Sequence, residues 1–217
     1  MSLTLHAHPL SSFCQKVLIA LYENDTPFTQ KLIDLGSDSA RAEFAKLWPI
    51  LKMPVLQDDA RGRIIPETSV IIEYLQRFYP GKTTFIPDDT EAALDVRLRD
   101  RFFDLYVNEP MQAIVGNRLR PADQKDPLGV ARARERLSGV YAQLDRELSE
   151  RPWACGDTFT MADCAAAPAL FYAEKVHPFK TAHKHVAVYF ERLMQRPSFA
   201  RAVAEARPFM SLFPQTD

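Results

Sequence analysis

The feature that most constrains the fold is the stretch from Leu3 to Tyr22, LTLHAHPLSSFCQKVLIALY. Residues 3–6 alternate between apolar and polar side chains, a pattern that predicts a half-buried strand. Pro9 should end this strand, because proline has no N–H to donate to a strand ladder. Residues 13–22 then place apolar side chains at helical spacing. The stretch therefore predicts a strand, a tight loop and a helix.

Two hydroxyls, those of Ser11 and Ser12, stand where this helix should begin. Ser12 and Gln15 have the spacing of a capping box, so we expect Ser12 to cap the helix. A helix N-terminus carries unpaired N–H groups and the positive end of the helix dipole, which together favour an anion. These residues alone leave two interpretations open: a pair of capping serines, or part of an anion-binding site.

Composition and charge exclude several classes of function. The 27 Lys and Arg residues balance 28 Asp and Glu residues, so we expect no nucleic-acid or anionic-membrane partner. No apolar run approaches the roughly 20 residues of a membrane-spanning helix, and no secretory signal pattern precedes the first strand. Cys14, Cys155 and Cys164 form neither a disulfide framework nor a zinc motif, which predicts a reducing cytoplasm. His183 and His185 would lie on different sides of a helix, so we expect no metal site.

Residues 1–80 alternate between strand and helix patterns, whereas the residues after position 90 show only helical spacing. The predicted order in the first part is β-α-β-α-β-β-α. We therefore expect an α/β domain over residues 1–80, a proline-bearing linker over 81–90, and an all-helical bundle over 91–217. Within the bundle, Thr160 and Asp163 have the spacing of a helix cap.

Four motifs occur in a fixed order along the chain. They are S-x-x-x-x-K-V-x-I-A-L from Ser11, M-P-V-L from Met53, P-E-T-x-x-I-x-x-Y-L from Pro66, and G-D-x-F-T-x-A-D from Gly156. With these motifs the chain resembles the cytosolic glutathione S-transferases over essentially its full length. The likeness is to serine-type, bacterial-like members, with some resemblance to the zeta, phi and tau classes.

The resemblance implies a thioredoxin-like N-terminal domain that carries a glutathione site, followed by an all-helical domain that forms a pocket for an apolar electrophile. It further implies a detoxifying transferase that is cytoplasmic and homodimeric. Glutathione would be the co-substrate, and no metal would be needed.

The resemblance places Ser11 at the family's catalytic hydroxyl position, with Ser12 as a neighbour that can substitute for it. The thiolate of glutathione is the nucleophile, and a free thiol has a pKa of about 8.5. A hydrogen bond from Ser11 (about 1.5–3 kcal/mol) together with the helix N-terminus (about 0.3–2 kcal/mol) is enough to lower that pKa by about 2 units. No general base is required, which agrees with the absence of a recognisable Ser-His-Asp set. Cys14 is predicted to be a small buried side chain.

Five residues are implied to bind the tripeptide. A cis peptide bond before Pro54 would expose the backbone of Met53 to pair with an extended peptide. Thr68 and the N–H groups around it would bind the γ-glutamyl carboxylate, and Glu67 would face the ammonium. Lys52 would bind the glycyl carboxylate, although a solvated surface lysine is an equally ordinary interpretation of that position.

The electrophile pocket is expected to include Leu10 and Tyr106. One departure from the family pattern bears on the glutathione site: residues 48–51, Trp-Pro-Ile-Leu, replace the more usual Asn-Pro-x-Gly. The missing glycine and the bulky Trp48 are expected to reshape the glycyl end of the site and to weaken glutathione binding.

Two other functions stay open from the sequence. A glutathione-dependent isomerase of the zeta (maleylacetoacetate) kind is suggested by two serines closely followed by a cysteine, but Phe13 interrupts that motif and Lys16 replaces its arginine. A non-catalytic interaction module with the transferase fold is the second alternative, and the altered segment at residues 48–51 is the feature that favours it.

Overall fold

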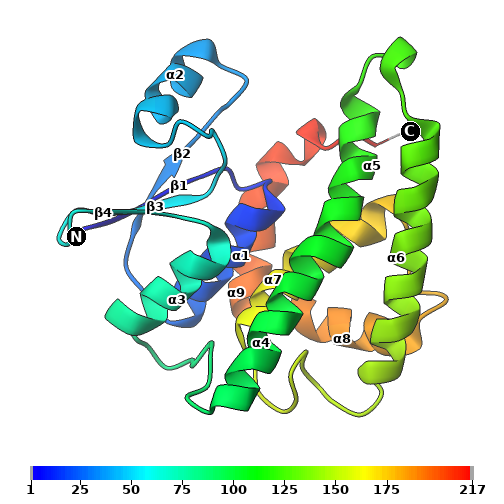
Figure 1. Cartoon of the computed structure of the whole chain (residues 1–217). Coiled ribbons are helices and arrows are strands. Elements are labelled where there is room, and N and C mark those ends of the chain that lie inside the picture. Colours follow the sequence, from blue (N-terminus) through cyan, green and yellow to red (C-terminus); the bar gives the residue numbers. More distant parts are fainter. Residues whose placement is uncertain (1, 216–217) are drawn as a thin grey trace.

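The computed structural model describes residues 2–215, and in this range the N-terminal part is built on one four-stranded sheet (Figure 1). Its strands lie in the order β2-β1-β3-β4, with β1 parallel to β2 and antiparallel to β3, and β3 antiparallel to β4. Leu5 is paired with Gln30 on one side and Leu56 on the other. The bounds are β1 (Leu3–Ala7), β2 (Thr29–Leu32), β3 (Val55–Asp58) and β4 (Arg63–Pro66).

Helices cover both faces of this sheet. The helices α1 (Ser12–Glu23) and α3 (Thr68–Phe78) share one apolar cluster with Leu3, Leu5 and Ala7. Because successive side chains of a strand point to opposite faces, His6 points the other way, and its ring lies 6.2 Å from that of Phe44 in α2 (Asp38–Leu47). The strand predicted from alternation is therefore confirmed, with its apolar residues directed at α1 and α3.

The rest of the chain is helical, and no strand follows β4 in the described residues. A long helical rod consists of α4 (Thr90–Phe102), the π-helical segment η1 (Phe103–Asn108) and α5 (Glu109–Leu119). The remaining helices are η2 (Ala122–Gln124), α6 (Pro127–Glu147), α7 (Met161–Val176), α8 (Lys184–Met194), α9 (Pro197–Ala206) and η3 (Arg207–Leu212). The predicted fold class, a β-α-β-α-β-β-α unit followed by an all-helical bundle, is confirmed.

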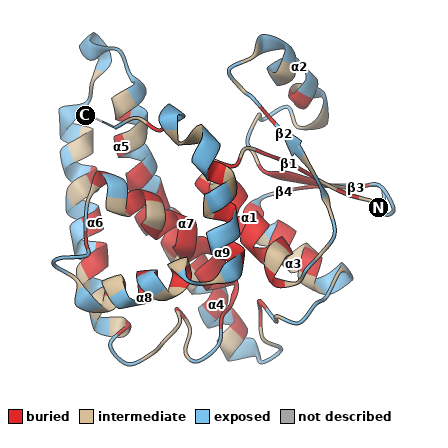
Figure 2. Ribbon diagram, turned by 180° about the vertical axis from the view of Figure 1, so that it is seen from behind, coloured by how far each residue is buried: buried red, intermediate tan, exposed pale blue. Residues whose placement is uncertain are grey.

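The helix α7 lies at the centre of the bundle, and nearly all of its residues are buried (Figure 2). Its predicted cap is confirmed: the Asp163 carboxylate accepts hydrogen bonds from the Thr160 N–H at 2.8 Å and from the Tyr189 hydroxyl at 2.6 Å. The helix α1 packs against both the sheet and α7. No helix in the described range is long and apolar enough to cross a membrane.

The structure corrects two details of the sequence prediction. Ser12 does not cap α1; Ser11 does, with an extended backbone and a side chain that accepts from the Cys14 N–H. Gln15 does not complete a capping box, because its amide is directed into the core and donates to the Pro9 carbonyl. The division into domains 1–80 and 91–217 with a linker over 81–90 stays a prediction.

A buried carboxylate ties the end of β3 to α3. Asp58 is fully buried and accepts hydrogen bonds from the hydroxyls of Tyr79 at 2.6 Å and Tyr74 at 2.7 Å. Burial alone would raise the pKa of Asp58, but these hydrogen bonds and those from backbone N–H groups outweigh it and hold the pKa below its usual value. A carboxyl group with a depressed pKa in the folded state stabilises the fold above its unfolded pKa, and that contribution is lost as the pH falls toward the folded value.

We predict that Asp58→Asn lowers the free energy of unfolding at pH 7 by about 2 kcal/mol, because two tyrosine hydroxyls lose a charged acceptor. The difference in unfolding free energy between the variant and the native protein should become smaller below about pH 4, where the carboxyl group begins to protonate. Urea unfolding at several pH values measures this, with Asp59→Asn, an exposed neighbour, as the control. A constant difference from pH 7 to pH 3 would contradict the assignment.

Candidate active site

The chain reaches α1 through a tight turn that positions Ser11. The Ser11 N–H donates to the His8 carbonyl at 3.0 Å, and the Leu10 N–H donates to His8 Nδ1 at 3.1 Å. Burial lowers the pKa of His8, against a weaker opposing effect of Asp34, so the ring is neutral at pH 7 and Nδ1 can accept. Two hydrogen bonds within the turn therefore help to fix its conformation.

The Ser11 side chain can serve as a cap and as a donor at the same time. Its Oγ accepts from the Cys14 N–H at 3.4 Å, which uses a lone pair of the oxygen. The hydroxyl proton can be donated to a ligand simultaneously. The two interpretations of this serine are consequently compatible, and capping does not argue against function.

Ser11 and Ser12 line a cavity of about 370 Å³, here called the Ser11 cavity. Leu10 also lines it. The helical part completes it with Met111, Gln112, Val115, Gly116 and Leu119 of α5, Tyr172 of α7, and Leu212, Phe213 and Pro214 near the C-terminus. None of these side chains is charged. The cavity thus offers an apolar enclosure with a few neutral hydrogen-bonding groups.

The five residues predicted to bind glutathione all line a second cavity, of about 380 Å³, here called the Met53 cavity. They are Lys52, Met53, Pro54, Glu67 and Thr68, joined by Phe13, Trp48 and Pro66. The helical part contributes Arg101, Asp104, Leu105, Glu109 and Gln112. Gln112 lines both cavities, so the two adjoin at this side chain.

Backbone geometry in the Met53 cavity suits an extended ligand. The Met53–Pro54 peptide bond is cis, as the resemblance implied. Within the described residues, the N–H and C=O of Met53 have no hydrogen-bond partner. The helix α3 begins without a side-chain cap at Glu67, which leaves its first N–H groups open toward the cavity. These groups can bind a peptide backbone and a carboxylate.

Two non-glycine residues beside this cavity have left-handed backbones. They are Leu51, with φ of 59°, and Glu67, with φ of 69°. Such conformations cost on the order of 1–3 kcal/mol and gather at ligand sites. Leu51 occupies the position where the family usually has glycine, and its side chain packs against the cluster of Ile33, Phe44 and Val55. This packing holds the leucine in a conformation that a glycine would adopt without strain.

A network of buried charges lies beneath the Met53 cavity. The Lys16 ammonium of α1 lies 2.6 Å from Asp100 Oδ1 and 2.8 Å from Asp104 Oδ2, and all three side chains are almost completely buried. Ser69 of α3 donates to Asp100 at 2.6 Å. Arg101, half exposed at the cavity wall, binds the same two carboxylates. Burial raises the pKa of Asp104, while Lys16 opposes this effect.

The structure also places the remaining predicted residues. Tyr106 lines neither cavity; it is 48% exposed, and its ring contacts that of Phe102 at 5.4 Å between centroids. Cys14 is fully buried, and burial raises the pKa of its thiol to about 11, although the Ser11 side chain partly opposes this. No cluster of three or more His, Cys, Asp or Glu side chains that could hold a metal ion occurs in residues 2–215.

Several lining residues of the two cavities were not predicted from the sequence, among them Arg101, Gln112 and Tyr172. Each lies within a helical pattern, where spacing indicates only which face is apolar. A helix can have two partly exposed faces. The face that lines a cavity is decided by how the helical part packs against the sheet, and no local motif predicts that packing.

Comparison with known proteins identifies the family. A glutathione S-transferase N-terminal domain model matches residues 5–83, and a glutathione S-transferase C-terminal domain model matches residues 128–192, together more than half of the chain. The chain belongs to the glutathione S-transferase family.

Similar proteins within this family span nearly the whole chain. Glutathione S-transferase GstB of Escherichia coli K12 is 26% identical over 203 residues, covering 93% of this chain and 97% of that protein. Glutathione S-transferase hmp2 of Hypomyces subiculosus is 28% identical over 201 residues, covering 88% and 94%. A glutathione S-transferase of Methylobacillus flagellatus KT, crystallised with glutathione, is 25% identical with a TM-score of 0.85, covering 93% and 98%. The chain is a glutathione S-transferase enzyme of this family.

Proposed function

We propose that the enzyme binds glutathione in the Met53 cavity, stabilises its thiolate with the Ser11 hydroxyl, and directs the sulfur at an electrophile in the Ser11 cavity. The observation that carries this proposal is the juxtaposition of the two cavities. One contains all five residues expected for the tripeptide, the other contains the hydroxyl at the start of α1, and they adjoin at Gln112.

The reaction requires only that the sulfur be ionised and directed at the electrophile. The thiol proton passes to solvent, and the thiolate then forms a bond to an electrophilic carbon. In a substitution a leaving group departs from that carbon; in an addition the displaced electron pair moves to the neighbouring atom, which takes a proton from solvent. Ser11 and the N-terminus of α1 stabilise the anion by about 2–3 kcal/mol, which corresponds to about 2 pKa units. Ser12, buried one residue further on, lines the same cavity. It is the substitute donor in this mechanism.

Binding of the tripeptide follows from the groups in the Met53 cavity. The open N–H groups at the start of α3, with Thr68, bind the γ-glutamyl carboxylate, and Glu67 pairs with its ammonium. The unpaired backbone of Met53 pairs with the cysteinyl residue of the tripeptide. Lys52, exposed at the rim, binds the glycyl carboxylate. The related enzyme crystallised with glutathione supports this choice of ligand.

The electrophile is an uncharged, mostly apolar small molecule. The Ser11 cavity has no charged lining residue, and burying a carboxylate without a counter-ion is strongly unfavourable. This argues against an isomerase of the zeta kind, because its maleyl substrates carry carboxylates. Leu10 belongs to this pocket, whereas Tyr106 would contact only an electrophile that extended beyond it. A detoxifying role and a cytoplasmic location are parts of the same proposal.

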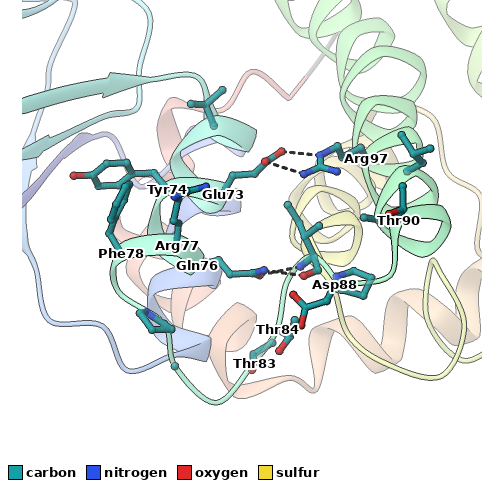
Figure 3. A pocket seen from close by; sticks show the side chains of 17 residues that line it. Glu73, Tyr74, Gln76, Arg77, Phe78, Thr83, Thr84, Asp88, Thr90 and Arg97 are labelled. Atoms are coloured by element: carbon teal, nitrogen blue, oxygen red, sulfur yellow. Dashed lines mark hydrogen bonds and ion pairs between the residues drawn. The ribbon is translucent and has the colours of Figure 1, made fainter.

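We further propose that the enzyme is a homodimer that pairs through α3 and α4. A cavity of about 820 Å³ lies between these helices and the segment that joins them, and a two-bond ion pair between Glu73 and Arg97 spans it (Figure 3). Beside it, apolar side chains are solvent-exposed: Val70 at 54%, Leu94 at 54% and Leu98 at 63%. An apolar face of this kind is typical of an interface with a second copy.

For the catalytic hydroxyl, we predict that Ser11→Ala raises the pKa of the bound glutathione thiol by about 1–2 units, because one hydrogen bond to the sulfur is lost. Turnover at pH 7 should fall about 3- to 25-fold, because the ionised fraction falls by that factor from a bound pKa of about 6.5, and it should recover at higher pH. The thiolate absorbance of the complex measures the pKa, and calorimetry at millimolar glutathione measures binding. Ser12→Ala is the matched control and should change the pKa far less.

An unchanged thiol pKa in Ser11→Ala would remove the assigned role. Absence of any glutathione binding to the native enzyme at millimolar concentration would instead favour the non-catalytic interaction module.

For the electrophile, we predict that a neutral halonitroaromatic is turned over at least about tenfold more efficiently than the same ring bearing a carboxylate. That ratio corresponds to about 1.4 kcal/mol, a small part of the cost of burying an unpaired charge. Values of kcat/KM for the matched pair test this. A preference for the carboxylate, or efficient isomerisation of a maleyl compound, would favour the zeta alternative.

For the dimer, we predict that Leu98→Glu converts the native dimer to a monomer, because it would bury a carboxylate at the interface. Sedimentation velocity measures the mass of the species. Leu128→Glu, at a residue of α6 that is 60% exposed, is the control and should leave the dimer intact. A native protein that sediments as a monomer at micromolar concentration would contradict the proposal.

A further inference from the structure

The turn that positions Ser11 has one carbonyl that its own residues cannot satisfy. Because the Ser11 N–H already bonds the His8 carbonyl across the turn, the Pro9 carbonyl needs an external donor. Gln15 supplies it: its Nε2 lies 2.9 Å from the Pro9 oxygen. Gln15 follows Ser11 by one helical turn and is fully buried.

The same amide reaches into the helical bundle. Gln15 Nε2 also donates to the hydroxyl of Tyr172 in α7, at 3.1 Å. Tyr172 is itself buried, and its ring stacks on that of Phe213 at 5.4 Å, so its position is fixed from within the bundle. One side chain therefore connects the turn before Ser11 to α7.

Stability gives no net preference for a glutamine at this site, because an apolar side chain would exchange an unsatisfied Gln15 acceptor for an unsatisfied Pro9 carbonyl. Gln15 Oε1 is buried and has no partner in the described residues, and an unsatisfied buried acceptor costs about 1–3 kcal/mol. An apolar side chain of similar shape would avoid this cost. What such a side chain could not do is hold the Pro9 carbonyl.

We propose that Gln15 is a positioning residue for the reaction: it holds the turn at residues 8–11 against Tyr172 and so aims the Ser11 hydroxyl at the glutathione sulfur. This inference rests on the proposed role of Ser11. A hydrogen bond weakens steeply with distance and angle. A small displacement of the turn would therefore reduce stabilisation of the thiolate without disturbing the residues of the Met53 cavity that bind the tripeptide.

The test is Gln15→Met, which keeps the length of the side chain and removes both donors. We expect the pKa of the bound glutathione thiol to rise by about 1 unit from about 6.5, and turnover at pH 7 to fall about threefold because the ionised fraction falls by that factor. Turnover should recover at high pH, and the dissociation constant of glutathione at about pH 5.5, where the bound sulfur is a thiol in both enzymes, should change less than about twofold. A merely structural role would lower stability and leave the thiol pKa unchanged.

Combination with Ser11→Ala makes the test specific. If Gln15 acts through Ser11, Gln15→Met should add no further shift in the thiol pKa to the Ser11→Ala enzyme. An equal shift in both backgrounds would overturn the inference, as would no shift in Gln15→Met when Ser11→Ala shows one. No shift in Ser11→Ala itself would refute the proposed function, and the positioning role with it.

A second variant keeps the inference testable if Gln15→Met fails to fold. Tyr172→Phe retains the ring against Phe213 and removes only the oxygen that accepts from Gln15. We therefore expect a rise in the thiol pKa of about 0.5 unit and a loss of turnover at pH 7 of less than about twofold. Tyr141→Phe is the control. The Tyr141 hydroxyl donates to the His177 carbonyl at 3.2 Å rather than to Gln15 or to the turn at residues 8–11. Equal effects of Tyr172→Phe and Tyr141→Phe on the thiol pKa would overturn the inference.

Discussion

The buried ammonium of Lys16 is the constraint on which the rest of this structure depends. An ammonium in the interior must be paired, because an uncompensated buried charge costs several kcal/mol. Its partners, Asp100 and Asp104, belong to the helical rod rather than to the sheet. The hydrogen bond from Ser69 brings the start of α3 into the same cluster. A shift of the bundle relative to the sheet would break this network. The charges of the network therefore favour one position of the bundle against the sheet.

This position of the bundle against the sheet creates both cavities. Each is lined on one side by residues of the first 80 positions and on the other by residues of α5. Arg101 of α4 and two residues of η1, Asp104 and Leu105, also line the Met53 cavity. The π-helical segment η1 lies between α4 and α5, and it carries Asp104 into the ion cluster. Such segments are rare in helices and are frequent at functional sites. The geometry of the proposed site is therefore a property of the contact between the two parts, and neither part contains the site alone.

This explains which features were predictable from the sequence. Strand alternation and helical spacing are local, so the order of elements was predictable from the sequence. Lys52, Met53, Pro54, Glu67 and Thr68 of the Met53 cavity lie in short motifs that resemble those of the family. The cap of α1 was misplaced by one residue because Ser11 and Ser12 are both good caps, and only the turn from His8 decides between them. Gln112 could not be found, since its importance arises where two cavities meet. The spacing from Ser12 to Gln15 predicted a capping role for Gln15. The hydrogen bond that Gln15 forms instead, to Tyr172, joins residues 157 positions apart, so no local pattern indicates it.

The distribution of charge over the two cavities gives the site its chemical asymmetry. Lys52, Glu67 and Arg101 stand around the Met53 cavity, while the Ser11 cavity has no charged lining residue. Glutathione carries two carboxylates and an ammonium, so in the proposed mechanism its ends are held among charges while its sulfur reaches the boundary with an apolar space. An anion at that boundary has few waters to stabilise it, and the hydroxyl of Ser11 with the N–H groups of α1 takes their place. The fixed turn before Ser11 matters for this reason, because a donor that replaces solvent must already be aimed when the sulfur arrives.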